Sequence, residues 1–308
     1  MARHWFRRVF RRCYQHIGQK PTEVSVKVEG EQITISSDAS LLIRNQDDGR
    51  VVPFEVLSVE NAPGFLVNAL SQSLTVRSID GEQTLVLAFE RGERVAISSK
   101  PTDRPPAASL RFTPDKDVLE YTWSTRFLFD HYLNRLSSLY PQTQFTLEFE
   151  GVETRFGGLG LRGLFEQASA PFQLLHEPVH VENGSTIAVE VMFAFHTSYK
   201  TTLISFVNDT RSPLTGVHER GFWTACDHFC DWLGVDRPHS RGSHGVAAVM
   251  FIRSHDVKFE AATRNSVTGP PALEEFVATS LFDDFKAWAE ERPVEHEQLK
   301  HVLPFRES

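Results

Sequence analysis

Hydrophobic and polar residues alternate in several short stretches of the chain, as they do in β-strands that bury one face. Residues 24–28 and 33–35 alternate on either side of a glycine-containing turn, and residues 74–79 and 84–89 do so around Asp80-Gly81. Alternation broken by such turns predicts two β-hairpins. The same period predicts strands at residues 109–112, 145–149 and 187–195, and a strand at 201–207 is expected to return from a turn at residues 196–200.

Hydrophobic residues recur every three or four positions in four other stretches, which predicts amphipathic helices. Helices are expected at residues 5–17, 64–71, 128–139 and 222–233, and from Pro271 to Pro293; the one at 64–71 is short and does not rest on this repeat. Gly234 is expected to end the fourth helix. The unbroken apolar run 246–252 predicts a central strand buried on both faces. Helices mixed with a mostly antiparallel sheet place the chain in the α+β class.

The composition is that of an ordinary globular protein. The chain has 308 residues, 41% of them hydrophobic, and a formal charge of −8, and its length suits about two domains. We expect these domains at residues 1–172 and 173–308. The sequence contains no run of ~20 apolar residues, which a membrane span needs, and no signal-peptide pattern. Three cysteines are too few for a disulfide scaffold, so we expect a cytoplasmic protein.

Positive charge is concentrated at the N-terminus. Residues 1–20 contain no acidic residue but five arginines, of which Arg3 precedes the first predicted helix and four lie in it: Arg7, Arg8, Arg11 and Arg12. The rest of the chain is therefore acidic, which argues against a large nucleic-acid footprint because neutralisation of phosphates drives such binding. We interpret the arginines as a solvated helix face, with contact to phosphate or anionic lipid as the alternative.

Three motifs have residue types of functional sites but not the expected pattern. In Cys226-x-His228-x-Cys230 the two cysteines share a helix face and the histidine points away, so we interpret the cysteines as core residues rather than metal ligands. The glycines of residues 157–163 lack the Walker lysine and a predicted strand-before-helix context, so they indicate a phosphate loop only weakly. Residues 242–245 lack the G-x-S-x-G pattern of a nucleophile elbow and predict a polar loop.

The order of several other motifs resembles the ATPase subunit of type IIA topoisomerases, which is the B subunit of DNA gyrase and its topoisomerase IV counterpart. In the second half, Val189-Glu190-Val191, residues 206–209 (FVND) and residues 216–222 (GVHERGF) are similar to the transducer domain of that family. In the first half, residues 64–71 resemble the helix that follows the ATP lid, and residues 110–115 (LRFTPD) resemble the V-R-F-x-P-D strand. The resemblance covers nearly the whole chain.

The resemblance implies a GHKL (Bergerat-type) α/β sandwich followed by a transducer domain with a left-handed βαβ crossover. In that family, a glutamate of the first helix activates water and an asparagine one turn later holds Mg²⁺. An aspartate in a D-x-G-x-G strand end and a G-T pair bind the adenine, and a glycine-rich lid wraps the phosphates. A Q-T-K loop of the transducer reaches the γ-phosphate.

The chain departs from the family's pattern at nearly all of these positions. Arginines fill the first helix, residues 33–40 replace the D-N-G-R-G strand end, and Ala107-Ala108 replaces the G-T pair. Residues 60–63 replace the lid glycines, and residues 261–264 replace the Q-T-K loop, where only Arg264 keeps the charge. Loss of a positioned general base alone costs about 10²–10⁴ in rate. We therefore predict a GHKL remnant, a pseudo-ATPase with no catalytic residue, cofactor or metal.

Three residues are left as candidates for contact with a nucleotide: Arg264 for a phosphate, Asp38 and Asn68. The first alternative is a divergent ATP-binding topoisomerase component that uses ATP and Mg²⁺, with Glu23, Asp47, Asp48 and Arg264 as its candidate groups. The second alternative is a nucleic-acid or membrane-surface binder that uses the N-terminal arginines.

The expected partner is a protein, in a topoisomerase-like or DNA-processing complex, with weak or indirect DNA contact and no membrane contact. The related family dimerises through an arm before the first helix, and we expect no such arm here, so a monomer or a heteromer is as expected as a homodimer. Because the family's cleavage-core domain would follow residue 308, we expect no DNA cleavage by this chain alone.

Overall fold

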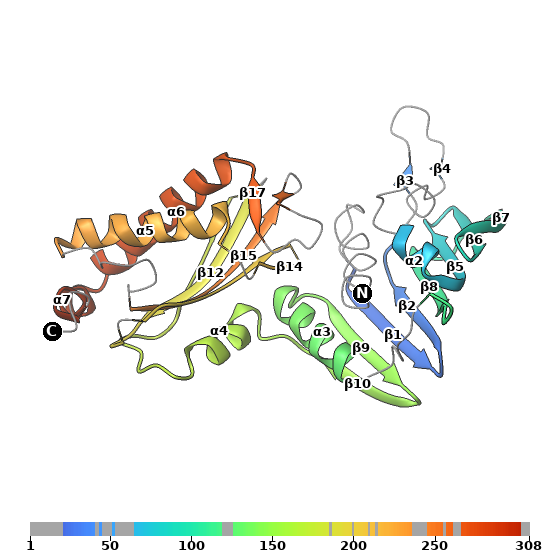
Figure 1. Ribbon diagram of the computed structural model, residues 1–308, viewed down its shortest axis with the longest axis horizontal. Coiled ribbons are helices and arrows are strands. Elements are labelled where there is room, and N and C mark those ends of the chain that lie inside the picture. The colour runs from blue at the N-terminus through green and yellow to red at the C-terminus, as the bar shows by residue number, and fades with distance from the viewer. Residues whose placement is uncertain are drawn as a thin grey trace. The chain divides into compact units, whose positions relative to one another are not determined.

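The computed structural model describes residues 21–40, 43–44, 51–52, 65–118, 126–184, 187–198, 200–208, 210–212, 215–235, 245–254, 257–260 and 266–302. The chain divides into two compact units, Met1–Leu159 and Gly160–Ser308 (Figure 1). This boundary precedes the one expected after residue 172, because helix α4 (Leu161–Ser169) packs on the sheet of the second unit. The first predicted helix, with its arginines, lies outside the described residues.

Within the described residues, unit 1 is built on an eight-stranded sheet in the order β10-β9-β1-β2-β8-β5-β6-β7. All neighbouring strands are antiparallel except β1 and β9, which are parallel. The strands are β1 (Glu23–Glu29), β2 (Gln32–Ser37), β5 (Ser71–Ile79), β6 (Gln83–Glu90), β7 (Glu93–Pro101), β8 (Ala107–Pro114), β9 (Gln144–Phe149) and β10 (Val152–Phe156). The pairings of β1 with β2 and of β5 with β6 confirm the two predicted hairpins.

Two helices, α2 (Phe65–Ala69) and α3 (Arg126–Leu139), supply further core residues to unit 1, and β3 (Ile43–Arg44) pairs with β4 (Val51–Val52). The core lies on one face of the eight-stranded sheet, where alternate strand residues such as Val26, Ile35 and Leu110 pack with Leu133 and Leu136 of α3. The opposite face carries the polar residues of the same strands. The period of two in the sequence therefore reports a sheet that buries one face.

Strand β7 was not expected from the sequence. Residues 93–101 have no regular alternation of hydrophobic and polar positions, and all nine are exposed. The strand exists because its backbone pairs with β6 along its length, with a bulge opposite Ala88 and Phe89. A strand at the edge of a sheet that buries neither face carries no hydrophobic signal, so only its pairing reveals it.

Unit 2 contains, among its described residues, a five-stranded sheet in the order β11-β12-β15-β13-β14. Its strands are β11 (Val179–Asn183), β12 (Ile187–Phe195), β13 (Thr202–Val207), β14 (Thr210–Arg211) and β15 (Val246–Ser254), and a separate hairpin joins β16 (Lys258–Phe259) to β17 (Val267–Gly269). Its further helices are α5 (Val217–Leu233), α6 (Ala272–Glu290) and α7 (Pro293–Val302). Because β13 and β15 are parallel and α5 connects them, a βαβ unit is present. The left hand of its crossover stays a prediction.

The core of unit 2 lies between the sheet and helices α5 and α6, which cover one face, whereas α4 covers part of the other (Figure 1). Strand β15 is central, and residues 246–252 are fully buried, as predicted. Cys226 and Cys230 of α5 are buried, which confirms them as core residues. Gly234 ends α5 with a φ of 73°. No helix among the described residues has both the length and the apolar character that a membrane span requires.

Candidate functional site

Two segments that differ from the family's adenine-binding motifs lie side by side in unit 1. Ser37, the last residue of β2, is directly opposite Ala108 of β8, and Ala108 is opposite Ser78 of β5. The hydroxyl of Ser37 accepts a hydrogen bond from the backbone N–H of Ala39 at 3.0 Å, and the Oγ atoms of Ser40 and Ser78 are 3.2 Å apart. These five described residues present hydroxyl and methyl groups and no carboxylate, so they do not fit a site that binds adenine through an acid.

Asp38, the carboxylate expected nearest to this cluster, is bound by the backbone at the start of β1. Its Oδ1 accepts hydrogen bonds from the N–H groups of Thr22 and Glu23 at 3.0 and 3.1 Å, and its Oδ2 accepts from the Thr22 N–H at 3.1 Å. The Thr22 hydroxyl donates to Oδ2 as well. The carboxylate therefore fastens the end of β2 to the start of β1, and a nucleotide-binding role for Asp38 stays a prediction.

Asn68 lies on α2 and is 1% exposed. Its Nδ2 donates a hydrogen bond to the carbonyl oxygen of Gly92 at 2.9 Å, which ties α2 to the turn between β6 and β7. At the end of the same helix, the Ser71 hydroxyl donates to the carbonyl of Val67 at 2.6 Å. These contacts give Asn68 a structural role in joining the helix to the sheet, and its predicted contact with a nucleotide stays untested.

Replacing Asn68 with alanine is expected to lower the free energy of unfolding by about 1–3 kcal/mol, because the buried Asn68 side chain is removed and the half-buried Gly92 carbonyl loses its partner. Urea unfolding followed by circular dichroism measures the change. Gln72→Ala, which alters an exposed side chain just beyond the same helix, serves as the control and is expected to change stability by less than about 0.5 kcal/mol. Equal stability of the two variants would contradict the structural role.

Other predicted residues are distributed as follows. Glu23 is exposed at the start of β1, while Asp47, Asp48, Arg264 and the N-terminal arginines lie outside the described residues.

The glycines near residue 158 do lie between a strand, β10, and a helix, α4, contrary to expectation. Gly158 itself has a packing role, because a Cβ there would lie 1.7 Å from the carbonyl oxygen of Ser137.

A buried polar cluster that the sequence did not reveal lies at the start of α5 in unit 2. The hydroxyl of Ser205 on β13 donates a hydrogen bond to Oε1 of Glu219 at 2.6 Å, and Nε2 of His218 is 3.1 Å from the same hydroxyl. Ser205 and His218 are 1% and 0% exposed. Nδ1 of His218 has no hydrogen-bond partner among the described residues. The helix predicted from the sequence begins at residue 222, whereas α5 begins at Val217 and includes His218 and Glu219. No pattern in the sequence indicated that Ser205 lies across from them.

Burial dominates the electrostatics of this cluster. Removal from water lowers the pKa of His218 to about 4, with a smaller contribution from the positive charge of Arg220. Burial also raises the pKa of Glu219 above its ordinary value, and the hydrogen bond from Ser205 opposes that rise. His218 is therefore neutral at pH 7. With Ser205 almost fully buried, the cluster joins β13 to α5 and offers no accessible nucleophile.

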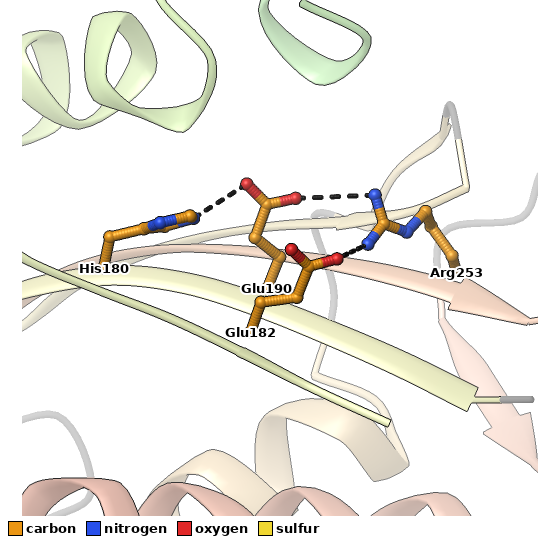
Figure 2. A network of polar contacts seen from close by, with 4 residues as sticks. All are labelled: His180, Glu182, Glu190 and Arg253. Atoms are coloured by element: carbon orange, nitrogen blue, oxygen red, sulfur yellow. Dashed lines mark hydrogen bonds and ion pairs between the residues drawn. The ribbon is translucent and has the colours of Figure 1, made fainter. Parts of the chain in front are cut away.

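A charged network crosses three strands of the same sheet on the face opposite α5 and α6 (Figure 2). Glu190 of β12 lies between His180 of β11 and Arg253 of β15. The Oε1 atom of Glu190 is 2.9 Å from Nε2 of His180, and its Oε2 atom is 3.6 Å from the guanidinium of Arg253. Glu182 pairs with the same guanidinium. The guanidinium of Arg253 is the opposite charge for both carboxylates, and His180 adds a hydrogen-bond contact to Glu190, so the network connects neighbouring strands of the sheet.

A metal centre is not assembled by the described part of the chain, where no three histidine, cysteine or acidic side chains converge. Cys226 and Cys230 are both buried. Burial raises the pKa of Cys226 well above its usual value, so this thiol is neutral, whereas metal binding requires a thiolate.

Comparisons with known proteins show that the chain is similar to DNA gyrase B and to related topoisomerase subunits. The sequence model of the DNA gyrase B family matches residues 160–304, which fall within unit 2. The DNA gyrase B protein of Streptococcus pyogenes is 25% identical over 253 residues, covering 74% of this chain and 38% of that protein. The chain thus spans less than half the length of such curated relatives.

Two solved structures share the fold of nearly the whole chain. The topoisomerase IV ATP-binding domain of Francisella tularensis has a TM-score of 0.78 at 16% identity, covering 98% of this chain and 90% of that chain. The 43K ATPase domain of Thermus thermophilus gyrase B has a TM-score of 0.75 at 17% identity, covering 97% and 87%. At such identities the match concerns the fold alone.

Proposed function

We propose, from the premise that this chain has the GHKL-type fold of the type IIA topoisomerase ATPase subunits, that it is a gyrase B-like component that does not hydrolyse ATP. On this proposal it acts through association with a protein partner in a topoisomerase-like or DNA-processing complex. ATP and Mg²⁺, which related ATPase domains use, have no role in its action.

The cluster around Ser37 carries the proposal. Its described side chains offer a hydroxyl and a methyl group, at Ser37 and Ala108, where the related family has an acid and a G-T pair. The neighbouring carboxylate of Asp38 already accepts hydrogen bonds from Thr22 and Glu23. A nucleotide base that entered here would find no free carboxylate among these residues to accept its amino proton.

The sequence also lacks the general base that ATP hydrolysis needs. The family places a glutamate on its first helix to activate water, whereas residues 1–22 of this chain contain no acidic residue. A missing general base costs about 10²–10⁴ in rate, before the altered lid and transducer loop are counted. Both units nevertheless keep extensive hydrophobic cores. A scaffold with an intact core and an altered centre supports a role in binding other proteins.

Isothermal titration of the full chain with a non-hydrolysable ATP analogue and Mg²⁺ tests the proposal directly. We expect no saturable heat, and no phosphate release from ATP in a steady-state assay. A matched variant, Ser37→Asp, places a carboxylate at the end of β2 and tests whether this group alone is enough to give nucleotide binding. Micromolar binding by the unaltered chain would overturn the proposal, and ATPase activity that is lost in Arg264→Ala would favour the divergent topoisomerase component instead.

A further inference from the structure

The polar face of the sheet in unit 1 contains two rows of side chains that cross five strands. Cross-strand pairing defines the first row as Thr34, Arg111, Thr75, Ala88 and Ala96. The same pairings define the second row as Ser36, Ser109, Arg77, Val86 and Ser98. We call these ten residues the two-row face. Each of them is exposed or half-buried, so the face is open to a partner.

The two-row face carries positive charge with no acid. Its two charged residues are Arg77 and Arg111, and the other eight side chains are hydroxyl-bearing or apolar. Because Arg77 is opposite Ser109 and Arg111 is opposite Thr75 on the adjacent strand, the two arginines are diagonal neighbours, about 7–8 Å apart. Two like charges at this spacing repel each other unless an anion lies between them.

Basic side chains at the other end of the same sheet face have acidic partners within the chain. Lys27 of β1 pairs with Glu29 and Glu148 at 2.9 Å, and Arg155 of β10 pairs with Glu153 at 2.9 Å. These cations are therefore already neutralised and leave little charge for a partner protein.

Arg77 and Arg111 differ from these cations, because the ion pairs among the described residues include neither of them. Lys100 of β7, two residues beyond Ser98 of the second row, is a further exposed cation outside these pairs. The positive charge without an ion-pair partner on this side of the sheet is thus gathered on and beside the two-row face, in a chain whose formal net charge is −8. The nearest acids of the same face are Glu90 and Glu93, which are exposed and lie opposite each other in the next row, beyond Ala88 and Ala96.

We propose that the two-row face is a docking surface for an acidic polypeptide segment of a partner protein. The planar guanidinium groups of Arg77 and Arg111 bind carboxylates in a bidentate manner, and the hydroxyls beside them donate further hydrogen bonds. Val86, Ala88 and Ala96 supply apolar contacts at one end of the rows. The inference deepens the proposed function, because it assigns the partner's chemistry, but it does not depend on whether ATP binds.

A polypeptide fits this face better than a nucleic acid. Binding of nucleic acids without sequence preference uses aromatic side chains on which bases stack, and the two rows contain none. Two arginines also release few counterions, and an acidic body opposes a phosphate backbone. An acidic segment with apolar residues between its carboxylates matches both the charge and the apolar end of the rows.

Fluorescence anisotropy with a labelled peptide of alternating glutamate and valine, titrated with the full chain, tests the proposal. We expect saturable binding that weakens with salt, and that weakens at least about tenfold in the double variant Arg77→Glu/Arg111→Glu. The matched control is Arg155→Glu/Arg162→Glu, which makes the same change in charge at exposed, ion-paired arginines and is expected to bind as the unaltered chain does.

Three results would overturn the proposal: no binding of the acidic peptide, equal weakening in both double variants, or tighter binding of a single-stranded oligothymidylate that depends on the same two arginines. Circular dichroism checks that each variant is folded. If the glutamate variant is unfolded, Arg77→Ser/Arg111→Ser replaces it, with loss of peptide binding still required. The ATP titration is separate, so nucleotide binding would end the proposed function while leaving this surface in place.

Discussion

The variant Gly221→Ala is expected to be less stable than the unaltered chain by about 2–4 kcal/mol. Gly221 lies inside α5, against α6. A Cβ at this position would lie 2.5 Å from the carbonyl oxygen of Glu274 and 2.8 Å from the Cβ of Val277. The carbonyl oxygen of Glu274 is a backbone atom and the Cβ of Val277 is attached directly to the backbone, so neither can move away by a side-chain rotation. The two helices would therefore have to separate, and the core of unit 2 would lose contacts.

Helix propensity alone predicts the opposite sign for this variant, since alanine is favoured over glycine in a helix interior by about 1 kcal/mol. Whether Gly221→Ala is less or more stable than the unaltered chain therefore shows whether the contact of α5 with α6 or the helix propensity of alanine has the larger effect. Urea unfolding followed by tryptophan fluorescence measures it, and Thr224→Ala, at a half-buried position of the same helix, is the control. A more stable Gly221→Ala variant would contradict the close contact of α5 with α6.

Acidification is expected to destabilise unit 2 through His218. Burial lowers the pKa of this histidine from 6.5 to about 4, so between these values the unfolded chain binds a proton that the folded chain does not. Stability is therefore fully present above about pH 6.5 and falls as the pH drops toward 4. A shift of this size corresponds to at most about 3 kcal/mol.

Glu219 contributes in the opposite direction. Its pKa is raised by burial, so its contribution to stability is greatest below its ordinary pKa and is lost as the pH rises through the folded value. Comparison with the variant His218→Gln, which keeps Glu219, separates the two groups.

The experiment is urea unfolding of the unaltered chain and of His218→Gln across this pH range. The stability difference between them is expected to shrink by about 3 kcal/mol from pH 7 to pH 4. His228→Gln, which changes an exposed histidine of the same helix, is the control and should follow the unaltered chain. A constant difference between the unaltered chain and His218→Gln would show that His218 is not buried as a neutral side chain.

Elements with a regular hydrophobic period are those that the sequence predicts well. The hairpin of β1 and β2, the stripe of α5 and the doubly buried strand β15 each combine burial with a fixed repeat, and each is confirmed. Strand β7 has no buried face, and α4 is short and follows a glycine-rich segment. Strand β7 forms through its backbone pairing with the adjacent strand β6, and α4 through its packing on strands of unit 2 that lie far along the chain.

In the candidate nucleotide site, too, the sequence predicts some features and only the structure reveals others, here at the level of single residues. The sequence identified residues 33–40 and Ala107-Ala108 as replacements for family motifs, and it selected Asp38 as the surviving acid. Pairing places Ser37, not Asp38, opposite Ala108. Because neighbouring residues of a strand face opposite sides of the sheet, a shift of one position decides which side chain lies beside Ala108. Register, which depends on long-range contacts, decides between them.

The sequence by itself determines the hydrophobic repeats and the lack of acid in residues 1–22, because both are properties of consecutive residues. Only the tertiary structure assigns α4 to unit 2, brings Ser205 to His218 and sets Arg77 diagonally to Arg111. Hydrophobic periodicity reports which side of an element is buried but not what lies across from it. Pairing and desolvation arise between segments distant in sequence, so the chemistry of these sites appears only when the chain is folded.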